Sequence, residues 1–152
     1  MQGSIAMFTI ERYNDTYRKD LLTMFRQHVP KYFAAHEEKD LIMFLDNWAH
    51  DFYVCKDGDE IVGCGGHNFD GDDTGVLSWY ITDINYIGKG VGAMLVQYNL
   101  DRLREHEHIK RIRVRTSQLT DKFYEKFGFR LIFTKDDYWG KGLHLYQMEM
   151  DA

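Results

Sequence analysis

Proline and cysteine are scarce in this sequence: one proline, Pro30, and two cysteines, Cys55 and Cys64, occur in 152 residues. Two cysteines are too few for a disulfide scaffold, and we favour reduced core thiols over a single bridge. No apolar run approaches the roughly 18 residues that a membrane-spanning helix needs. The N-terminus also lacks the charged and then apolar pattern of a secretion signal. We therefore expect a cytoplasmic protein with no membrane partner.

Basic side chains are outnumbered, with 19 Lys and Arg against 24 Asp and Glu and a formal net charge of -5. A nucleic-acid-binding surface usually needs an excess of positive charge, so we expect no nucleic-acid partner. The hydrophobic content of 44% and the aromatic content of 15% are typical of a globular fold. The length predicts one domain, residues 7–152, after a flexible leader or tag remnant at residues 1–6.

The first third of the chain predicts a strand followed by two helices. Residues 7–13 alternate apolar and polar side chains, which predicts the strand. Asn14 is a typical helix cap, and the apolar spacing after it predicts a helix that ends near Pro30. Residues 39–50 predict the second helix. The intervening segment, residues 31–40, is both aromatic and polar, which fits either an acceptor-binding lip or a solvated helix end.

The rest of the chain predicts strands on either side of a central helix. Two turns, KDGD at residues 56–59 and DGDD at residues 70–73, join strands expected at residues 52–55, 60–66, 63–69 and 75–82. The central helix is expected over residues 90–103. Further on, we expect a strand around Ile112 and Val114, a helix over residues 121–127, a strand over 129–133, a loop or flap over 135–142 and a last strand over 144–150. This order predicts a central sheet with helices on both faces.

Three glycines at alternate positions, Gly88, Gly90 and Gly92, precede the amphipathic helix. The first N–H groups of a helix have no intrahelical partner and the helix dipole is positive there, so this turn is suited to binding phosphate. The pattern is neither the Walker motif nor the dinucleotide fingerprint. Taken alone, it is also compatible with an ordinary loop.

A second sequence pattern, about thirty residues further along the chain, favours a ligand-binding role for the glycine turn. Ile87–Gly92 (IGKGVG) and Ser117–Phe129 together resemble the GNAT superfamily of acyl-CoA-dependent N-acyltransferases. The family's loop, Arg/Gln-x-x-Gly-x-Gly/Ala, is matched except at its opening position, where Ile87 stands. In the second signature Ser117 and Thr120 stand where the family has Asn and Ala. Its Tyr-x-Lys-x-Gly-Phe part is intact, from Tyr124 to Phe129.

The resemblance implies a fold and a reaction. The fold is a GNAT-like α/β (α+β) arrangement, with a mixed, mainly antiparallel central sheet of about seven strands and helices on both faces. In the reaction, a primary amine attacks the thioester of acetyl-CoA directly and forms a tetrahedral intermediate. The co-substrate is therefore acetyl-CoA, and no metal is implied.

The resemblance also implies residue roles. The pyrophosphate is expected on the glycine turn, the pantetheine arm beside a fourth strand that splays from the fifth, and the oxyanion on the backbone N–H of Ile81. Tyr124 stands at the family's general-acid position. A phenol can act as an acid there because it is mostly protonated at neutral pH; simple packing of Tyr124 is the alternative. The expected cofactor-binding residues are Tyr80, Ile81, Thr82, Ile87, Gly88, Lys89, Gly90, Val91, Gly92, Ser117 and Tyr124.

A general base is harder to identify. Many relatives place a Glu on the fourth strand, but Ser78–Tyr80 contains no carboxylate. The candidates are His67, Asp83, Asp46 and His50, with a water chain as the alternative. His106 and His108 lack further ligands at metal-binding spacing.

Tyr32, Phe33 and Trp79 are expected to line the acceptor site, and the acceptor is expected to be the amine of a small molecule or a peptide. The resemblance makes a homodimer possible. A catalytically silent CoA-binding or sensing module of the same fold is the alternative function, because Ile87, Ser78 and Ser117 depart from the family pattern.

Overall fold

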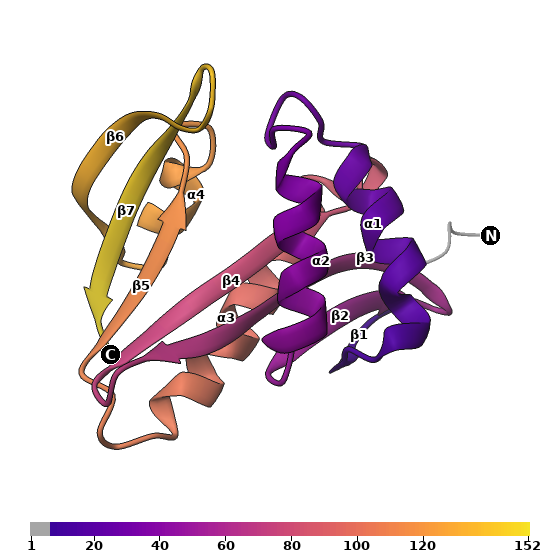
Figure 1. Cartoon of the computed structure of the whole chain (residues 1–152). Coiled ribbons are helices and arrows are strands. Elements are labelled where there is room, and N and C mark those ends of the chain that lie inside the picture. The colour runs from indigo at the N-terminus through magenta and orange to yellow at the C-terminus, as the bar shows by residue number, and fades with distance from the viewer. Residues whose placement is uncertain (1–6) are drawn as a thin grey trace.

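The computed structural model describes residues 7–152, and the expected leader at residues 1–6 lies outside them. Seven strands form one sheet in the order β1-β2-β3-β4-β5-β7-β6 (Figure 1). The strands are β1 (Phe8–Arg12), β2 (Phe52–Asp57), β3 (Glu60–Asp70), β4 (Thr74–Thr82), β5 (Arg111–Thr116), β6 (Arg130–Gly140) and β7 (Leu143–Asp151). In the described sheet only the β4–β5 pair is parallel, so the expected mixed, mainly antiparallel sheet is confirmed.

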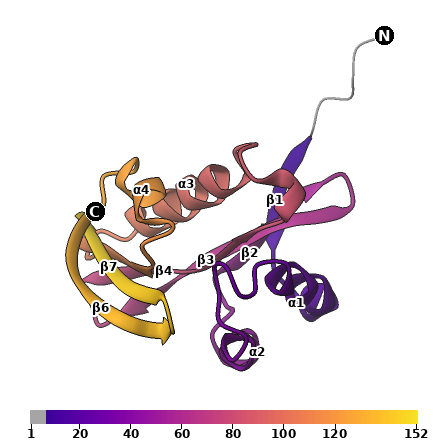
Figure 2. The ribbon, with the colours of Figure 1, turned by 90° about the horizontal axis from the view of Figure 1, so that it is seen from above.

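Helices cover both faces of the sheet, as predicted. Helices α1 (Arg18–Arg26) and α2 (Glu37–Asn47) lie on one face, and α3 (Val91–Arg104) and α4 (Asp121–Glu125) lie on the other (Figure 2). Two short 3-10 helices, η1 (Asp15–Tyr17) and η2 (Ile84–Tyr86), precede α1 and α3. No helix within residues 7–152 is long and apolar enough to cross a membrane.

The first helical segment begins and packs as its sequence predicts. The side chain of Asn14 accepts a hydrogen bond from the N–H of Thr16, which caps η1. Leu21, Met24 and Phe25 then recur at helical spacing and are all buried against the sheet.

Glycines allow α3 to lie close to the sheet. A Cβ atom on Gly63 of β3 would be 2.5 Å from Cγ1 of Val91, and one on Gly75 of β4 would be 2.6 Å from Cδ2 of Leu103. Both helix residues are fully buried, so their side chains have little room to move. The fixed position of α3 sets the position of the glycine turn at its N-terminus.

Strands β4 and β5 separate halfway along β4. They pair from Thr74 to Leu77, and no β5 residue pairs with β4 beyond that point in the described chain. A register shift against β3 inserts an extra residue into β4 here, where Trp79 has a positive φ of 57°. The expected splay of the fourth and fifth strands is therefore confirmed, and the edge of β4 is open from Ser78 to Thr82.

The expectation of a loop or flap over residues 135–142 is wrong. Strand β6 continues to Gly140, and only Lys141 and Gly142 form the turn. A register shift between Lys135 and Gly140 absorbs the extra residues: residues 136–139 of β6 stand opposite His144 alone of β7. There the carboxylate of Asp137 accepts a hydrogen bond from the N–H of Gly142 at 2.7 Å. An edge strand exposes most of its side chains, so this segment has a polar sequence. A polar sequence of this kind is also typical of a loop, which is why the strand was not predicted.

Smaller corrections concern element boundaries. The two strands expected at residues 60–66 and 63–69 are the single strand β3, and α2 begins at Glu37 and ends at Asn47, not His50. Helix α4 ends at Glu125, because the following turn leads directly to Gly128, with its positive φ of 104°. Cys55 and Cys64 are both free and buried, in different core clusters, which confirms reduced core thiols.

Candidate functional site

The glycine turn between η2 and α3 is open to a ligand. Gly88 and Gly90 have φ values of 82° and 87°, a left-handed conformation that side chains disfavour. A Cβ atom on either residue would meet no atom within 4 Å. Gly90 stands directly before the first turn of α3, and Ile87 is 53% exposed beside it.

Backbone N–H groups in this turn lack partners. Within residues 7–152, the N–H groups of Gly88, Gly90, Val91 and Gly92 donate to no protein acceptor, whereas that of Lys89 donates to the carbonyl oxygen of Tyr86 at 3.2 Å. Unpaired donors at the positive end of a fourteen-residue helix are suited to binding an anion such as a diphosphate. The turn therefore fits the phosphates of a coenzyme.

The open edge of β4 leads toward this turn. The hydroxyl of Tyr80 donates to the carbonyl oxygen of Gly66 at 3.1 Å, and the carbonyl oxygen of Thr82 accepts from Nε2 of His28 at 2.5 Å. The backbone N–H of Ile81 lies against the buried thiol of Cys64. Burial raises the pKa of that thiol and the N–H opposes the rise. The expected oxyanion donor thus faces a sulfur atom.

Tyr124 packs beside the open edge of β4, and its neighbour in sequence, Phe123, lies next to the glycine turn. Tyr124 is 6% exposed, and its ring is 6.4 Å from that of Tyr80 in an edge-on arrangement. Burial raises the pKa of the phenol, and the hydroxyl hydrogen-bonds to no group within residues 7–152. Close by, a Cβ atom on Gly92 would be 3.4 Å from the ring of Phe123 and 3.6 Å from Oγ1 of Thr82. The structure thus brings the predicted acid, open edge and glycine turn together.

Two other predicted cofactor residues have structural partners. Ser117 follows β5 and is buried, and its hydroxyl accepts a hydrogen bond from the N–H of Leu119 at 3.2 Å. The ammonium of Lys89 lies 5.0 Å from the centre of the Tyr86 ring.

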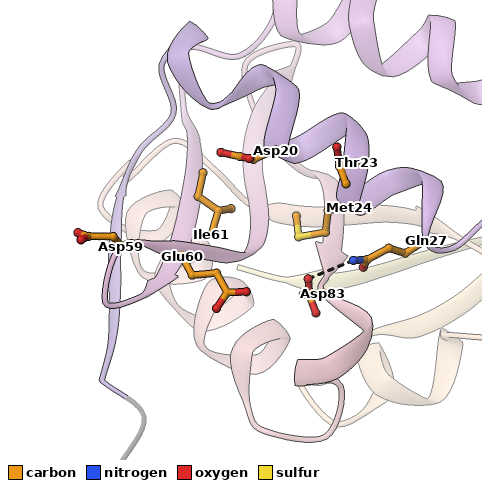
Figure 3. A pocket seen from close by; sticks show the side chains of 8 residues that line it. All are labelled: Asp20, Thr23, Met24, Gln27, Asp59, Glu60, Ile61 and Asp83. Carbon is orange, nitrogen blue, oxygen red and sulfur yellow. Dashed lines mark hydrogen bonds between the residues drawn. The ribbon is translucent and has the colours of Figure 1, made fainter.

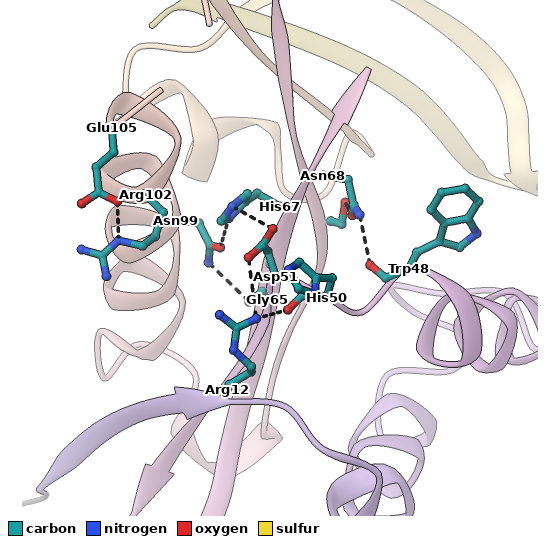
Figure 4. A network of polar contacts seen from close by, with 12 residues as sticks. Arg12, Trp48, His50, Asp51, Gly65, His67, Asn68, Asn99, Arg102 and Glu105 are labelled. Atoms are coloured by element: carbon teal, nitrogen blue, oxygen red, sulfur yellow. Dashed lines mark hydrogen bonds and ion pairs between the residues drawn. The ribbon is translucent and has the colours of Figure 1, made fainter. Parts of the chain in front are cut away.

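His67, a candidate base, lies in a buried polar network (Figure 4). Its Nδ1 is 2.7 Å from Oδ1 of Asn99, a residue of α3. The Asn99 amide donates to the carbonyls of Gly65 and Leu95, so its oxygen must face His67 and accept the Nδ1 proton. Nε2 then faces Asp51 at 3.7 Å. Burial lowers the pKa of His67, which favours the neutral imidazole, and the contact with Asn99 holds the ring against α3.

Asp83, the second candidate, directly follows β4. Its carboxylate accepts hydrogen bonds from the N–H of Asn85 at 2.9 Å and from Nε2 of Gln27 at 3.2 Å. It lines a pocket of about 260 Å³ with Asp20, Thr23, Met24, Gln27, Asp59, Glu60 and Ile61 (Figure 3). Four of these eight side chains are carboxylates, which gives the pocket an acidic lining.

The remaining candidate bases are placed elsewhere. Asp46 forms an ion pair with Arg18 at 2.5 Å, and His50 is exposed beyond α2.

Two of the three predicted acceptor residues, Phe33 and Trp79, are in contact. Phe33 stacks on Trp79 with ring centres 5.9 Å apart, and Phe25 and Phe44 flank the same indole. Tyr32 instead packs edge-on against His28 at 5.6 Å. Sequence reasoning missed His28, because a single histidine near the end of a helix carries no signal of its contact with a strand 54 residues away.

Comparison with known proteins identifies the family. Residues 21–129 match the acetyltransferase (GNAT) family. The chain therefore belongs to this family of acyltransferase enzymes. No match was found among curated proteins.

Solved structures share the fold. Ard1 from Thermoplasma volcanium superposes with a TM-score of 0.81 at 18% identity, over 95% of this chain and 97% of that one. A ribosomal-protein-alanine N-acetyltransferase from Brucella melitensis gives 0.76 at 18%, over 95% and 99%. An aminoglycoside 6'-N-acetyltransferase complexed with coenzyme A gives 0.76 at 15%, over 94% and 96%. At these identities the likeness shows the fold alone.

Proposed function

We propose that this chain is an N-acetyltransferase that transfers the acetyl group of acetyl-CoA to a primary amine. The observation that carries the proposal is the set of four N–H groups, on Gly88, Gly90, Val91 and Gly92, that have no partner in the described part of the chain, together with the open edge of β4 and the phenol of Tyr124. The complex of a structural neighbour with coenzyme A supports the same ligand.

The coenzyme is proposed to follow these features in order. Its pyrophosphate accepts hydrogen bonds from the glycine turn, with Ile87 and Lys89 at the turn's entrance. Its pantetheine arm lies along Tyr80–Thr82 and pairs with the backbone that β5 leaves free, as an added strand does. Ser117, at the end of β5, faces the arm from the other side.

The proposed reaction is a direct transfer. The amine nitrogen attacks the thioester carbon, a carbon–nitrogen bond forms, and the carbon–sulfur bond breaks as Tyr124 gives its proton to sulfur. The proton lost by the amine then restores the phenol through solvent. Because burial raises the pKa of Tyr124, the phenol stays protonated but is a weaker acid. We therefore expect its proton to move as the carbon–sulfur bond breaks. The N–H of Ile81 is proposed as the oxyanion donor, a role in which it would exchange its contact with the thiol of Cys64 for the oxyanion.

Among the candidate bases, Asp83 is favoured over His67. It directly follows the open strand and lines an acidic pocket, whereas the unprotonated nitrogen of His67 faces Asp51 inside the fold. A water molecule between Asp83 and the amine would relay the proton.

The acceptor is proposed to be a cationic amine of a small molecule or peptide. The carboxylates of the pocket attract an ammonium group, and the aromatic cluster of Phe33 and Trp79 offers apolar contact. The neighbours named for ribosomal-protein alanine and for aminoglycosides fall within this class. Residues 7–152 are proposed to act as one domain, and a cytoplasmic location stays a prediction from the sequence.

The test replaces Tyr124 by Phe and compares it with Tyr98→Phe, a tyrosine of α3 outside the site. Acetyl-CoA turnover is followed through free thiol with a panel of amines, and coenzyme A affinity is measured by calorimetry. We expect Tyr124→Phe to lower kcat about a hundredfold and to leave the coenzyme A Kd within about threefold. The Tyr98 variant should match the parent. Coenzyme A binding without turnover in the parent would instead favour the silent CoA-binding module, and absence of binding would contradict both.

A further inference from the structure

His28 reaches the open edge of β4, although it belongs to the turn after α1. Its Nε2 is 2.5 Å from the carbonyl oxygen of Thr82, the last residue of β4. The next N–H along the chain, that of Asp83, donates to the carbonyl oxygen of Val62 on β3 at 2.8 Å. Because the C=O and N–H of one trans peptide point in opposite directions, the carbonyl of Thr82 faces away from β3. The imidazole of His28 therefore lies on the side of β4 that β5 leaves free.

The backbone of His28 is fixed by hydrogen bonds on both sides. Its N–H donates to the carbonyl oxygen of Phe25 at 3.0 Å. Its own carbonyl oxygen accepts from the N–H groups of Tyr32 and Phe33, at 2.9 and 3.2 Å. The turn after α1 is therefore closed around this residue, and the side chain can project in one direction only.

The residue before His28 strengthens the same junction. Gln27 donates from Nε2 to the carboxylate of Asp83 at 3.2 Å (Figure 3), and its Oε1 accepts from the N–H of Ile84 at 3.0 Å. Consecutive residues after α1 thus bond to consecutive residues at the end of β4. This junction holds the imidazole in place beside the strand.

The hydrogen bond to Thr82 determines which nitrogen of His28 is basic. A carbonyl oxygen only accepts, so Nε2 carries the proton, and Nδ1 has the free lone pair of the neutral ring. Nδ1 forms no hydrogen bond within residues 7–152, although the residue is only 6% exposed. In that part of the chain, Nε of Arg102 is the only side-chain nitrogen or oxygen that is both closed to solvent and without a partner. Nδ1 of His28 is therefore open to a bound molecule.

The lone pair of His28 is less occupied than those of the other candidate bases. His67 directs its unprotonated nitrogen at Asp51 inside the fold, and the carboxylate of Asp83 already accepts two hydrogen bonds. The ring of His28 also packs edge-on against Tyr32, which is expected to line the acceptor site, with ring centres 5.6 Å apart. His28 thus lies between the proposed coenzyme edge and a proposed acceptor residue.

We propose that Nδ1 of His28 is the general base that first accepts the proton of the attacking amine. This inference rests on the proposed function and adds one residue to it. As the carbon–nitrogen bond forms, the nitrogen gains positive charge, one of its N–H bonds breaks, and the proton passes to the lone pair of Nδ1. The carbonyl of Thr82 stabilises the imidazolium through the Nε2 proton, and its second lone pair stays available to the pantetheine arm. The water molecule at Asp83 then takes the proton to solvent, and the imidazole returns to its neutral form.

Replacement of His28 by Gln separates basicity from hydrogen bonding, because a Gln amide can still donate to Thr82 but has no basic nitrogen. The assay uses the amine of the panel that the parent acetylates fastest. We expect kcat to fall about a hundredfold, with the coenzyme A Kd within about threefold of the parent value and the urea midpoint unchanged. His108→Gln, an exposed histidine beyond the far end of α3, should match the parent.

Chemical rescue provides the second readout. His28→Ala leaves space for an imidazole from solution, so added imidazole should raise its kcat with concentration and should leave the parent unchanged. Parent-level kcat in His28→Gln overturns this inference alone. So does a loss of stability that accompanies the loss of kcat, with no rescue of His28→Ala. A parent that binds coenzyme A without turnover overturns the proposed function as well.

The tautomer of His28 can be measured without any acceptor. In NMR of protein labelled with ¹⁵N-histidine, the His28 signals are those absent from His28→Gln. They should show the proton of the neutral ring on Nε2. A neutral ring protonated on Nδ1 would offer no lone pair to the amine and would overturn the proposal.

Discussion

Tyr124 and His67 are both buried, yet burial shifts their pKa values in opposite directions, because it disfavours the charged form of each. The phenol of Tyr124 stays neutral by keeping its proton, and the imidazole of His67 stays neutral by losing one. Tyr124 can therefore supply a proton next to the open strand. His67 has its one proton held by Asn99.

The shift at His67 predicts how stability depends on pH. Its pKa in the folded state lies below the unfolded value of about 6.5, so the unfolded chain takes up the proton first as pH falls. The free energy of unfolding should therefore decrease below about pH 6.5, by at most about 1.4 kcal/mol per pH unit for one group. Above that range the contribution of His67 is fully present.

Urea unfolding at several pH values checks this. His67→Gln should show a flatter decrease than the parent below pH 6.5, while His36→Gln, an exposed histidine before α2, should keep the parent slope. Equal slopes for the parent and His67→Gln would contradict the assignment.

At the residue scale, the sequence predicted what local motifs encode. The glycine turn and the Tyr124 segment each have their signature within a few consecutive residues, so both motifs could be identified from the sequence. The contacts of His28 with Thr82 and of His67 with Asn99 join residues 54 and 32 positions apart. No periodicity or spacing predicts such pairs, because the packing of whole elements creates them.

At the scale of elements, glycines determine how closely the layers approach. Gly66 of β3 is the glycine at which an added Cβ atom would come closest to a backbone atom. A Cβ atom there would be 2.4 Å from the carbonyl oxygen of Asp51, which also accepts from the N–H of His67 at 2.9 Å. A carbonyl fixed by a hydrogen bond cannot move aside cheaply.

We therefore predict that Gly66→Ala lowers the free energy of unfolding by about 2 kcal/mol. Gly92→Ala is the matched comparison, since its Cβ would meet only ordinary contacts at 3.4 Å and beyond, in the first turn of a helix. Its stability should equal or slightly exceed that of the parent. The midpoints of urea unfolding at constant m-value measure both, and similar midpoints for the two variants would refute the packing argument.

Element types were predicted well, but some extents were not. Strand β6 was expected to end at Phe133, because Lys135–Gly142 is rich in charge and glycine. The continuation to Gly140 depends on pairing with β7 on either side of the register shift between Lys135 and Gly140. Pairing between strands is a property of the sheet, so one strand's own composition cannot reveal it.

At the scale of the whole molecule, the separation of β4 from β5 organises the proposed site. Their pairing ends at Leu77, and beyond it the edge of β4 that leads toward the N-terminus of α3 has no partner strand among residues 7–152. The parallel connection through α3 places the glycine turn at the carboxyl end of β4, where ligands bind in sheets of this kind. Sheet order and the site position both follow from this crossover.

The central claim is that main-chain N–H groups of the glycine turn hold the diphosphate of coenzyme A. Titration of ¹⁵N-labelled protein with coenzyme A, followed by NMR, measures those groups directly. The amide resonances of Gly88, Gly90, Val91 and Gly92 should move downfield with saturation. That of Lys89, already bonded to Tyr86, should move less, and pantetheine without phosphate should leave all of them in place. Coenzyme A binding that leaves these four resonances unmoved would contradict the account.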